Sequence, residues 1–369
     1  MWMKRITIIF GISMAAILAL TTLLSAVAPN QPRVVPTAAP VATFPPPPAP
    51  ESIVFAQRFL HPAGLYTVAV PAGWGVDEAE NTRAGLRTVL GNEAAQSVIQ
   101  VDMDRPPRSS DSGPLTLDVL DARYNDAWLA SSWLEYRDWE ESERRRSADD
   151  RLIIDFALQH GGQTFVARQQ SWTDGEWIYA VRVVTPENAT AALLQLLEGT
   201  ADSLRPLKEL ADTPFLWNAW FDGERAHFIR YPQDWTLSDS APGRPTSISG
   251  GDASLRIESL EGQVADEAAA GASVSARHSG AEVLSVSALA QEGAEGFAVA
   301  WRGRNVDGDS HSGFDVLLNG ADGQLHVASL RFPGLTDLNT EEGAAAEPDL
   351  EMMMRSFRLL PDLAAELAG

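Results

Sequence analysis

The stretch GLYTVAVPAGW at residues 64–74 returns 161 positions later as RAHFIRYPQDW at residues 225–235. In both stretches a run of strand-forming residues leads to a proline, and a tryptophan follows three residues later. A period of two predicts a half-buried β-strand, and proline ends the strand because it cannot donate to a β-ladder. The sequence therefore predicts two copies of one domain, each containing such a strand.

Both copies also share a hairpin and a helix near their ends. Residues 172–179 and 320–327 each place Asp-Gly between two strand-forming runs, which is a strong hairpin signal. Apolar residues then recur at helical spacing; they are Leu194, Leu197, Ala201 and Leu204 in the first copy and Leu350, Met353, Met354 and Phe357 in the second. We expect an amphipathic helix to close each copy.

Strand patterns fill the region between these landmarks. We expect further strands over 96–104, 151–159, 163–172 and 176–185 in the first copy and over 254–260, 282–289, 296–304 and 312–319 in the second. A middle helix is expected over 117–128, with an Ala-rich counterpart over 264–277. Short connections between strands favour antiparallel pairing. The predicted fold is α+β: two tandem α/β/α sandwich domains, 51–208 and 212–361, each with a mostly antiparallel sheet, and a tail over 362–369.

The composition limits the kind of partner. The chain has 369 residues, with 28 basic and 50 acidic side chains and a formal net charge of −22. Nucleic acids and anionic headgroups are bound by cationic surfaces, so we expect no nucleic acid partner. The absence of cysteine excludes disulfides, thiolate nucleophiles, cysteine-ligated zinc, Fe–S clusters and a lipidated N-terminal cysteine.

The N-terminal residues 1–28 predict a membrane segment. From Ile6 to Ala28 the chain runs 23 residues without a charge, directly after Lys4 and Arg5. A helix of this length spans the ~30 Å hydrocarbon core of a bilayer. We interpret it as an uncleaved anchor or, alternatively, as a secretory signal that is cleaved. The positive-inside rule then gives a single-pass protein of the cell membrane with its C-terminal part outside the cytoplasm, or a secreted protein if cleavage occurs. Residues 29–50 are rich in proline and predict an extended spacer.

These features together resemble the PsbP-like family. The resemblance rests on a strand ending in Pro-x-x-Trp (68–74 and 229–235), a β-rich middle with an embedded helix, and a closing helix that ends in Ser-Leu or Ser-Phe. The family includes the photosynthetic extrinsic PsbP proteins and bacterial envelope proteins of the DcrB and LpqN types. The resemblance covers nearly all of the chain after residue 51, twice. It implies an α/β/α sandwich used as a binding or accessory module rather than as an enzyme.

The sequence offers little that could carry catalysis or hold a metal. It lacks the H-E-x-x-H, G-x-S-x-G and P-loop motifs, so we expect no catalytic residue and no cofactor. Asn305, Asp307 and Asp309 alternate like the start of a calcium loop, but glycine is missing at the sixth position and glutamate at the twelfth. A polar turn without metal is the favoured interpretation. His227 and His326 lie in predicted strands, where we interpret them as buried structural histidines.

Several tryptophans of the first copy suggest an interaction surface. Trp133, Trp139, Trp172 and Trp177 lie near or beyond the middle helix and around the Asp-Gly hairpin. If exposed together, they would form a protein-binding patch, whereas a tryptophan-rich core is the alternative. The charged run 140–146 is expected to guard the edge of a sheet.

These observations favour a membrane-tethered, extracytoplasmic, non-enzymatic module that acts through protein–protein contacts in the cell envelope. The alternative is binding of a lipid or another small ligand in a groove between sheet and helix. A hydrolase that uses scattered histidine and aspartate residues is the third possibility. The expected partner is thus an envelope protein or a small ligand, and the membrane is contacted through Ile6 to Ala28.

Overall fold

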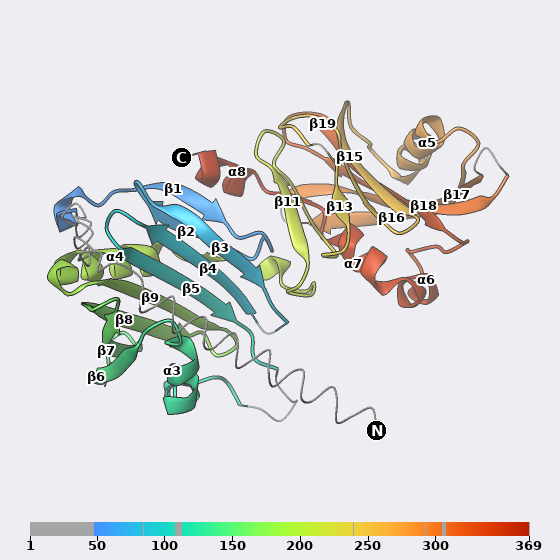
Figure 1. Ribbon diagram of the computed structural model, residues 1–369. Helices are drawn as coiled ribbons and strands as arrows, with labels where there is room; N and C mark the ends of the chain where they lie inside the picture. Colours follow the sequence, from blue (N-terminus) through green and yellow to red (C-terminus); the bar gives the residue numbers. More distant parts are fainter. Residues whose placement is uncertain are drawn as a thin grey trace, which may run out of the picture. The chain divides into compact units, whose positions relative to one another are not determined.

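The computed structural model describes residues 48–83, 85–107, 113–238, 240–291, 293–304 and 308–368. These residues form two seven-stranded antiparallel sheets, each accompanied by a small three-stranded sheet and a few helices (Figure 1). The α+β class and the repeated antiparallel sheet agree with the sequence prediction. The predicted membrane segment from Ile6 to Ala28 lies outside the described residues. Within the six described ranges, no helix is long and apolar enough to cross a membrane.

The first large sheet has the strand order β3-β4-β5-β9-β8-β7-β6. Its strands are β3 (Gly75–Asn81), β4 (Gly85–Asn92), β5 (Ser97–Asp104), β6 (Asp138–Arg146), β7 (Leu152–His160), β8 (Gln163–Thr173) and β9 (Ile178–Pro186). The small sheet consists of β1 (Phe55–Leu60), β2 (Tyr66–Pro71) and β10 (Arg205–Pro206). The α-helices are α2 (Leu117–Arg123), α3 (Asp126–Ser132) and α4 (Thr190–Ser203), and short 3₁₀ turns are η1 (Pro50–Ser52), η2 (Glu187–Ala189) and η3 (Lys208–Leu210).

Two hydrophobic cores lie on opposite faces of this sheet, because neighbouring residues of a strand point to opposite sides. Tyr179, Val181 and Val183 of β9 pack with the small sheet and α4. Ile178 and Val184 of the same strand belong to the core under α2 and α3. The first domain therefore has three layers, and one outer layer combines a helix with the small sheet.

The second large sheet has the order β13-β14-β15-β19-β18-β17-β16. Its strands are β13 (Thr236–Leu237), β14 (Thr246–Gly250), β15 (Ala253–Glu261), β16 (Glu282–Gln291), β17 (Ala294–Arg304), β18 (Ser310–Asn319) and β19 (Gln324–Pro333). The small sheet consists of β11 (Asn218–Asp222), β12 (His227–Tyr231) and β20 (Arg358–Leu359). The helices are α5 (Glu267–Arg277), α6 (Glu341–Ala346) and α7 (Pro348–Arg355). The last helix, α8 (Pro361–Ala368), packs on β1, and its Leu363 belongs to the core that includes Tyr179 of the first domain.

The second domain repeats the three layers. Ile229 of the small sheet and Met353 of α7 belong to the core on one face. Val274 of α5 packs with the core on the other face. Helix α5 begins after Asp266, whose carboxylate accepts a hydrogen bond from the Ala269 amide at 2.8 Å and so satisfies a donor in the first turn.

The structure adds elements that the sequence pattern did not indicate. Strands β3, β4, β13 and β14 extend both sheets beyond β5 and β15. Part of the expected tail, 362–369, belongs to helix α8, in which Leu363 is buried. The charged strand β6 is the last strand of its sheet, as expected for a run that guards an edge.

Candidate functional site

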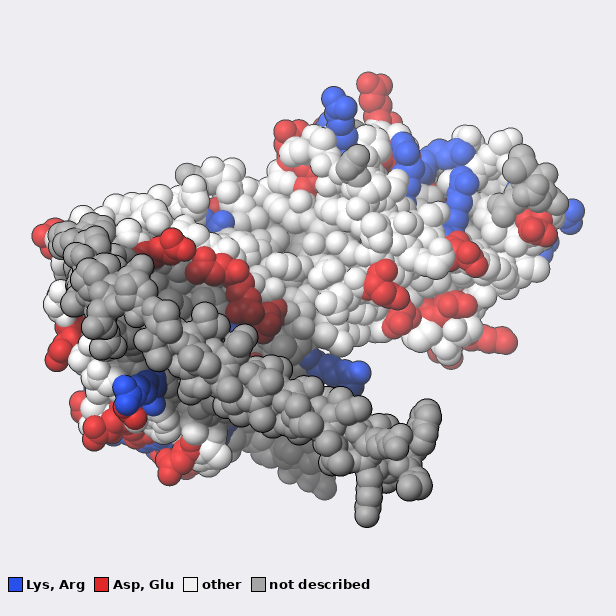
Figure 2. Space-filling view, viewed as in Figure 1, with Lys and Arg blue, Asp and Glu red and all other residues white. Residues whose placement is uncertain are grey.

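A polar groove lies between the sheet and the middle helix of the second domain. Its volume is about 480 Å³, and strands β14, β15 and β19 form its floor next to the C-terminal end of α5. Blue side chains gather on the visible surface over β15 and α5 (Figure 2). The lining is mostly hydroxyl and charged groups, with Ser247, Ser249, Ser254, Arg256, Glu258, Arg277, His278, Ser329 and Arg331 contributing.

The strand register explains why these side chains meet. Arg256 of β15 lies opposite Ser247 of β14 and opposite Ser329 of β19. Two residues further along β19, Arg331 lies opposite Ser254. Because residues two apart share a face of the sheet, both rows point toward α5.

Trp301 of β17 is buried behind His278 and Arg331, two of the residues that line the groove. Its indole stacks on the His278 ring, with centroids 4.0 Å apart and planes at 19°, and the Arg331 guanidinium lies 5.6 Å from the indole centroid. Gly313 of the neighbouring strand makes this placement possible, because a Cβ there would overlap the Trp301 indole. Gly313 of β18 thus leaves room for the indole of Trp301 to lie over the neighbouring strand.

Asp315 of β18 is the fully buried centre of the polar network. Its Oδ1 accepts hydrogen bonds from Trp301 Nε1 at 3.0 Å and from Ser329 Oγ at 2.7 Å. Its Oδ2 lies 3.0 Å from Arg277 Nη1 and 3.0 Å from His278 Nε2. Four donors on one carboxylate fix the end of α5 to the sheet, since two of them come from that end of the helix.

Charge is unevenly balanced around the groove. Glu258 pairs with Arg256 at 3.0 Å and with Arg277 at 3.2 Å. Arg331 donates from Nη2 to His278 Nδ1 at 3.0 Å, and no carboxylate of the described residues lies within ion-pair distance of it. Three arginines therefore face two carboxylates, Glu258 and Asp315, which leaves local positive charge in a chain of net charge −22.

The groove also holds a serine, a histidine and an aspartate, but not in the geometry of a proton relay. Arginine has no acceptor, so the Arg331 contact makes His278 Nδ1 the acceptor and leaves the ring proton on Nε2. Both Ser329 Oγ, at 3.3 Å, and Asp315 Oδ2 lie at that protonated Nε2. A catalytic triad needs the serine and the carboxylate on different ring nitrogens. This cluster therefore positions side chains and does not activate Ser329.

The strand histidines form a separate buried pair. His227 Nε2 lies 2.7 Å from His326 Nδ1, and Ser259 Oγ lies 3.2 Å from the former and 3.0 Å from the latter. Burial, together with His326, lowers the pKa of His227 to about 3. Both histidines are buried, as the sequence predicted for structural histidines.

In the first domain the corresponding region is closed by aromatic residues. Gln169 lies opposite Arg182 in the β8–β9 ladder and accepts from its Nε at 3.0 Å and from its Nη2 at 2.6 Å. The Arg182 guanidinium lies 4.4 Å from the ring of Trp133 and 5.3 Å from that of Trp128. Burial lowers the pKa of Arg182 to about 10. The polar pair is thus enclosed rather than open to a ligand.

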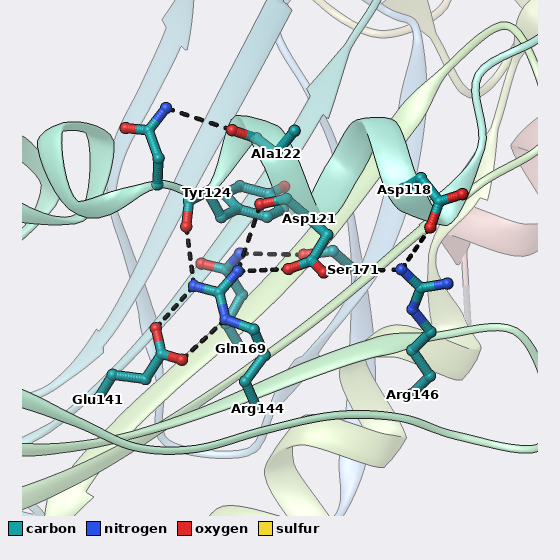
Figure 3. Close-up of polar contacts among 10 residues, drawn as sticks. Asp118, Asp121, Ala122, Tyr124, Glu141, Arg144, Arg146, Gln169 and Ser171 are labelled. Carbon is teal, nitrogen blue, oxygen red and sulfur yellow. Dashed lines mark hydrogen bonds and ion pairs between the residues drawn. The ribbon is translucent and has the colours of Figure 1, made fainter.

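The arginines of β6 are occupied as well (Figure 3). Arg144 donates through Nε and Nη2 to Glu141 at 2.8 and 2.6 Å, through Nη1 to Asp121 at 2.6 Å, and through Nη2 to the Tyr124 carbonyl at 2.8 Å. Arg146 donates to an Asp118 oxygen at 2.6 Å. These bonds attach α2 and its C-terminal turn to the edge strand and leave Arg144 committed to protein partners.

The four tryptophans singled out from the sequence do not form one exposed surface. Trp133 and Trp177 are 2% and 1% exposed, so they are core residues. Trp133 and the half-buried Trp139 belong to the core under α2 and α3, whereas Trp177 and Trp172 belong to the core on the opposite face. Aromatic rings are the largest apolar groups available, and both faces of the sheet need them.

The candidate calcium residues are mostly outside the described part of the chain. Asn305 and Asp307 lie outside the described residues, and Asp309 is exposed immediately before β18. Among the residues that the structure describes, no group of three or more metal-ligating side chains is found. The groove residues Arg256, Arg277 and Arg331, and the buried residues Trp301 and Asp315 behind them, were not predicted from the sequence. The sequence feature that bears on this cluster is the combination of a large residue, Trp301, with a small one, Gly313. That these two residues lie opposite each other is known only from the register of β17 and β18.

No protein-family model matches the chain, and no curated protein matches it. Among solved structures, it is similar to cyanobacterial PsbP (CyanoP) from Synechocystis sp. PCC 6803, with 17% identity and a TM-score of 0.30, covering 39% of this chain and 92% of that chain. It is also similar to the T6SS immunity protein TplEi from Pseudomonas aeruginosa, with 11% identity, a TM-score of 0.24, and coverage of 83% and 97%. A further similar structure is the Tle4-Tli4 complex, with 10% identity, a TM-score of 0.23, and coverage of 78% and 98%.

Proposed function

We propose that this chain is a non-enzymatic binding module and that the groove of its second domain binds a small polar ligand through an anionic group. The observation that supports this most directly is the set of three arginines facing two carboxylates at an open, hydroxyl-lined surface. Guanidinium groups bind carboxylates and phosphates through charge-assisted hydrogen bonds. Of the interpretations drawn from the sequence, the proposal adopts ligand binding in a groove between sheet and helix, and not protein binding through a tryptophan surface.

The lining narrows the ligand class. Four serines flank the arginines; Ser329 donates to Asp315, and the hydroxyls of Ser247, Ser249 and Ser254 can donate to and accept from sugar or other hydroxyl groups. Three of the twelve lining residues, Ile248, Leu255 and Leu260, have apolar side chains, and two of these, Ile248 and Leu255, are buried, so the groove presents few apolar side chains to an acyl chain. A carboxylated or phosphorylated saccharide matches these groups better than a lipid tail does.

The setting that we propose is the outer face of a cell membrane. The support is the uncharged stretch from Ile6 to Ala28 behind Lys4 and Arg5, with the proline-rich residues 29–50 as a spacer. A net charge of −22 keeps such a module away from anionic membrane surfaces. The module would then present its groove to soluble or envelope-borne ligands.

Calorimetric titration of the detergent-purified full-length chain tests the ligand class. The probes are glucuronate, glucose 6-phosphate and, as the neutral reference, glucose. We expect saturable binding of at least one anionic sugar and none of glucose. Arg331→Ala should weaken that binding about 10-fold or more, since a charge-assisted hydrogen bond contributes about 1.5–3 kcal/mol.

The matched control is Arg244→Ala, which removes an exposed arginine of the second domain outside the groove. It should bind like the parent chain. Equal affinity for glucose and the anionic sugars, or equal loss in both variants, would contradict the proposal.

A further inference from the structure

The three arginines of the second-domain groove differ in how far protein carboxylates already occupy them. Arg277 is occupied on both terminal nitrogens: Nη1 lies 3.0 Å from Asp315 Oδ2, and Nη2 lies 3.2 Å from Glu258 Oε1. Arg256 donates from Nε to Glu258 Oε2 at 3.1 Å, and its Nη2 lies 3.0 Å from the same oxygen. Arg331 differs from both, because no carboxylate of the described residues lies within ion-pair distance of it.

Glu258 is the carboxylate that limits the positive charge of the groove. It stands two residues beyond Arg256 on β15, so both side chains lie on the same face of the sheet, and its own side chain is 15% exposed. The His278 ring is neutral, as its acceptor role at Nδ1 requires. Three arginines against the carboxylates of Glu258 and Asp315 therefore leave a formal local charge of +1.

The surroundings of the groove do not add to this single positive charge. The C-terminal end of α5 lies next to the groove, and the carbonyl groups at a helix C-terminus carry a partial negative charge. The chain as a whole has a net charge of −22. A ligand group with one negative charge is thus compensated in full, whereas a second negative charge would have no partner and would lie beside two carboxylates.

We propose that the groove selects a sugar with one monoanionic group, such as a carboxylate or a sulfate ester, over a sugar with a dianionic phosphate, and that Glu258 determines this selectivity. The inference rests on the proposed function, since it requires that the groove binds an anionic sugar. Arg331 receives the anionic group, because it is the arginine without a carboxylate partner in the described structure. Glu258 Oε1 accepts from Arg277 and retains a lone pair for a neighbouring sugar hydroxyl.

Two glucose esters separate the effect of charge from that of shape. Glucose 6-sulfate and glucose 6-phosphate carry a tetrahedral ester group on the same carbon. At pH 8 the sulfate has one negative charge and the phosphate has two, because the second pKa of a phosphate monoester is about 6. Calorimetric titration of the detergent-purified full-length chain with each ester gives the ratio of the two affinities. We expect the parent chain to bind the sulfate more tightly.

Two substitutions should move this affinity ratio in opposite directions. Glu258→Gln removes one negative charge and should shift the ratio toward the phosphate by about 10-fold, the effect of one unit charge a few ångströms from the ligand at a protein surface. Arg256→Gln should shift it toward the sulfate by a similar factor. The Arg256 side chain is 55% exposed, so this second variant tests the proposal even where Glu258→Gln does not fold.

The matched control is Glu261→Gln, at an exposed position of the same strand outside the groove. It changes the net charge by the same amount as Glu258→Gln and should leave the affinity ratio unchanged. Thermal melting establishes that each variant is folded. Tighter binding of the phosphate by the parent chain, or equal shifts in Glu258→Gln and Glu261→Gln, would overturn the selectivity while leaving anion binding in place. Binding of neither ester would overturn the function proposed for the groove, and the selectivity with it.

Discussion

Asp315→Ala is the substitution that tests the polar network behind the groove. The change removes the one acceptor shared by Trp301 Nε1, Ser329 Oγ, Arg277 Nη1 and His278 Nε2, all within 3.0 Å of the carboxylate. Asp315 is fully buried, so bulk water does not supply the hydrogen bonds that its carboxylate accepted, and the four donors are left unsatisfied. The second domain should therefore lose stability.

The magnitude follows from the partners left behind. Arg277 retains Glu258 at 3.2 Å, so its charge is not wholly unpaired. Removing one member of a buried ion pair costs about 3–5 kcal/mol, and a buried donor without an acceptor costs about 1–3 kcal/mol. Because Arg277 keeps one partner, we expect the free energy of unfolding to fall by about 3–4 kcal/mol.

Differential scanning calorimetry of the full-length chain measures this loss. For a domain of this size, 1 kcal/mol corresponds to about 2–4 °C, so the melting transition of the second domain should fall by roughly 6–16 °C. Asp309→Ala, at an exposed carboxylate of the same strand region, is the control and should leave the transition in place. A shift below about 4 °C for Asp315→Ala would refute the view that this carboxylate holds the end of α5 to the sheet.

Two further perturbations examine the packing and the buried histidines. Gly313→Ala places a Cβ against the Trp301 indole and should lower the free energy of unfolding by about 1–3 kcal/mol. Gly75→Ala, whose Cβ would lie at ordinary contact distance, 3.8 Å from Asp77 Oδ1, should not. Equal melting of the two variants would contradict the close approach of Gly313 to Trp301. His227 has a pKa of about 3 in the folded chain, below its ordinary value of about 6.5. The unfolded chain therefore binds more protons between these values, and stability should fall as the pH drops from about 6.5 toward 3. His227→Gln should flatten that part of the melting-temperature profile, and an unchanged slope would exclude His227 as a contributor.

The sequence predicted the parts of the fold that depend on local pattern. The repeated Pro-x-x-Trp strand and Asp-Gly hairpin placed two copies of one antiparallel unit, and β6 emerged as a charged edge because Glu140 and its neighbours could not be buried. Strands β3, β4, β13 and β14 were missed because their sequences alternate weakly. β3, for example, contains Asp77, Glu78 and Glu80 at a solvent-exposed edge. Such strands form because they pair with a neighbouring strand, and this pairing leaves no alternating hydrophobic pattern in the sequence.

The groove could not be predicted for a related reason. Its residues come from three strands and the end of a helix, and their sequence separations run from one residue to more than fifty, as between Arg277 and Arg331. The four tryptophans illustrate the converse error. A count of aromatic residues does not reveal that Trp133 and Trp177 lie on opposite faces of a sheet that buries both.

The contrast between the two copies supports the assignment of the groove to the second. In the first copy, α2 and α3 bring Trp128 and Trp133 over Arg182, so large rings fill the space between helix and sheet. In the second copy, α5 reads EAAAGASVSAR; its small side chains pack mainly on β16 and β17, and Arg277 at its C-terminal end pairs with Glu258 of β15. The sheet face that remains open is the one on which Arg256 and Arg331 stand. Under the proposed function, the first copy closes this space as a core and the second leaves it open to a ligand.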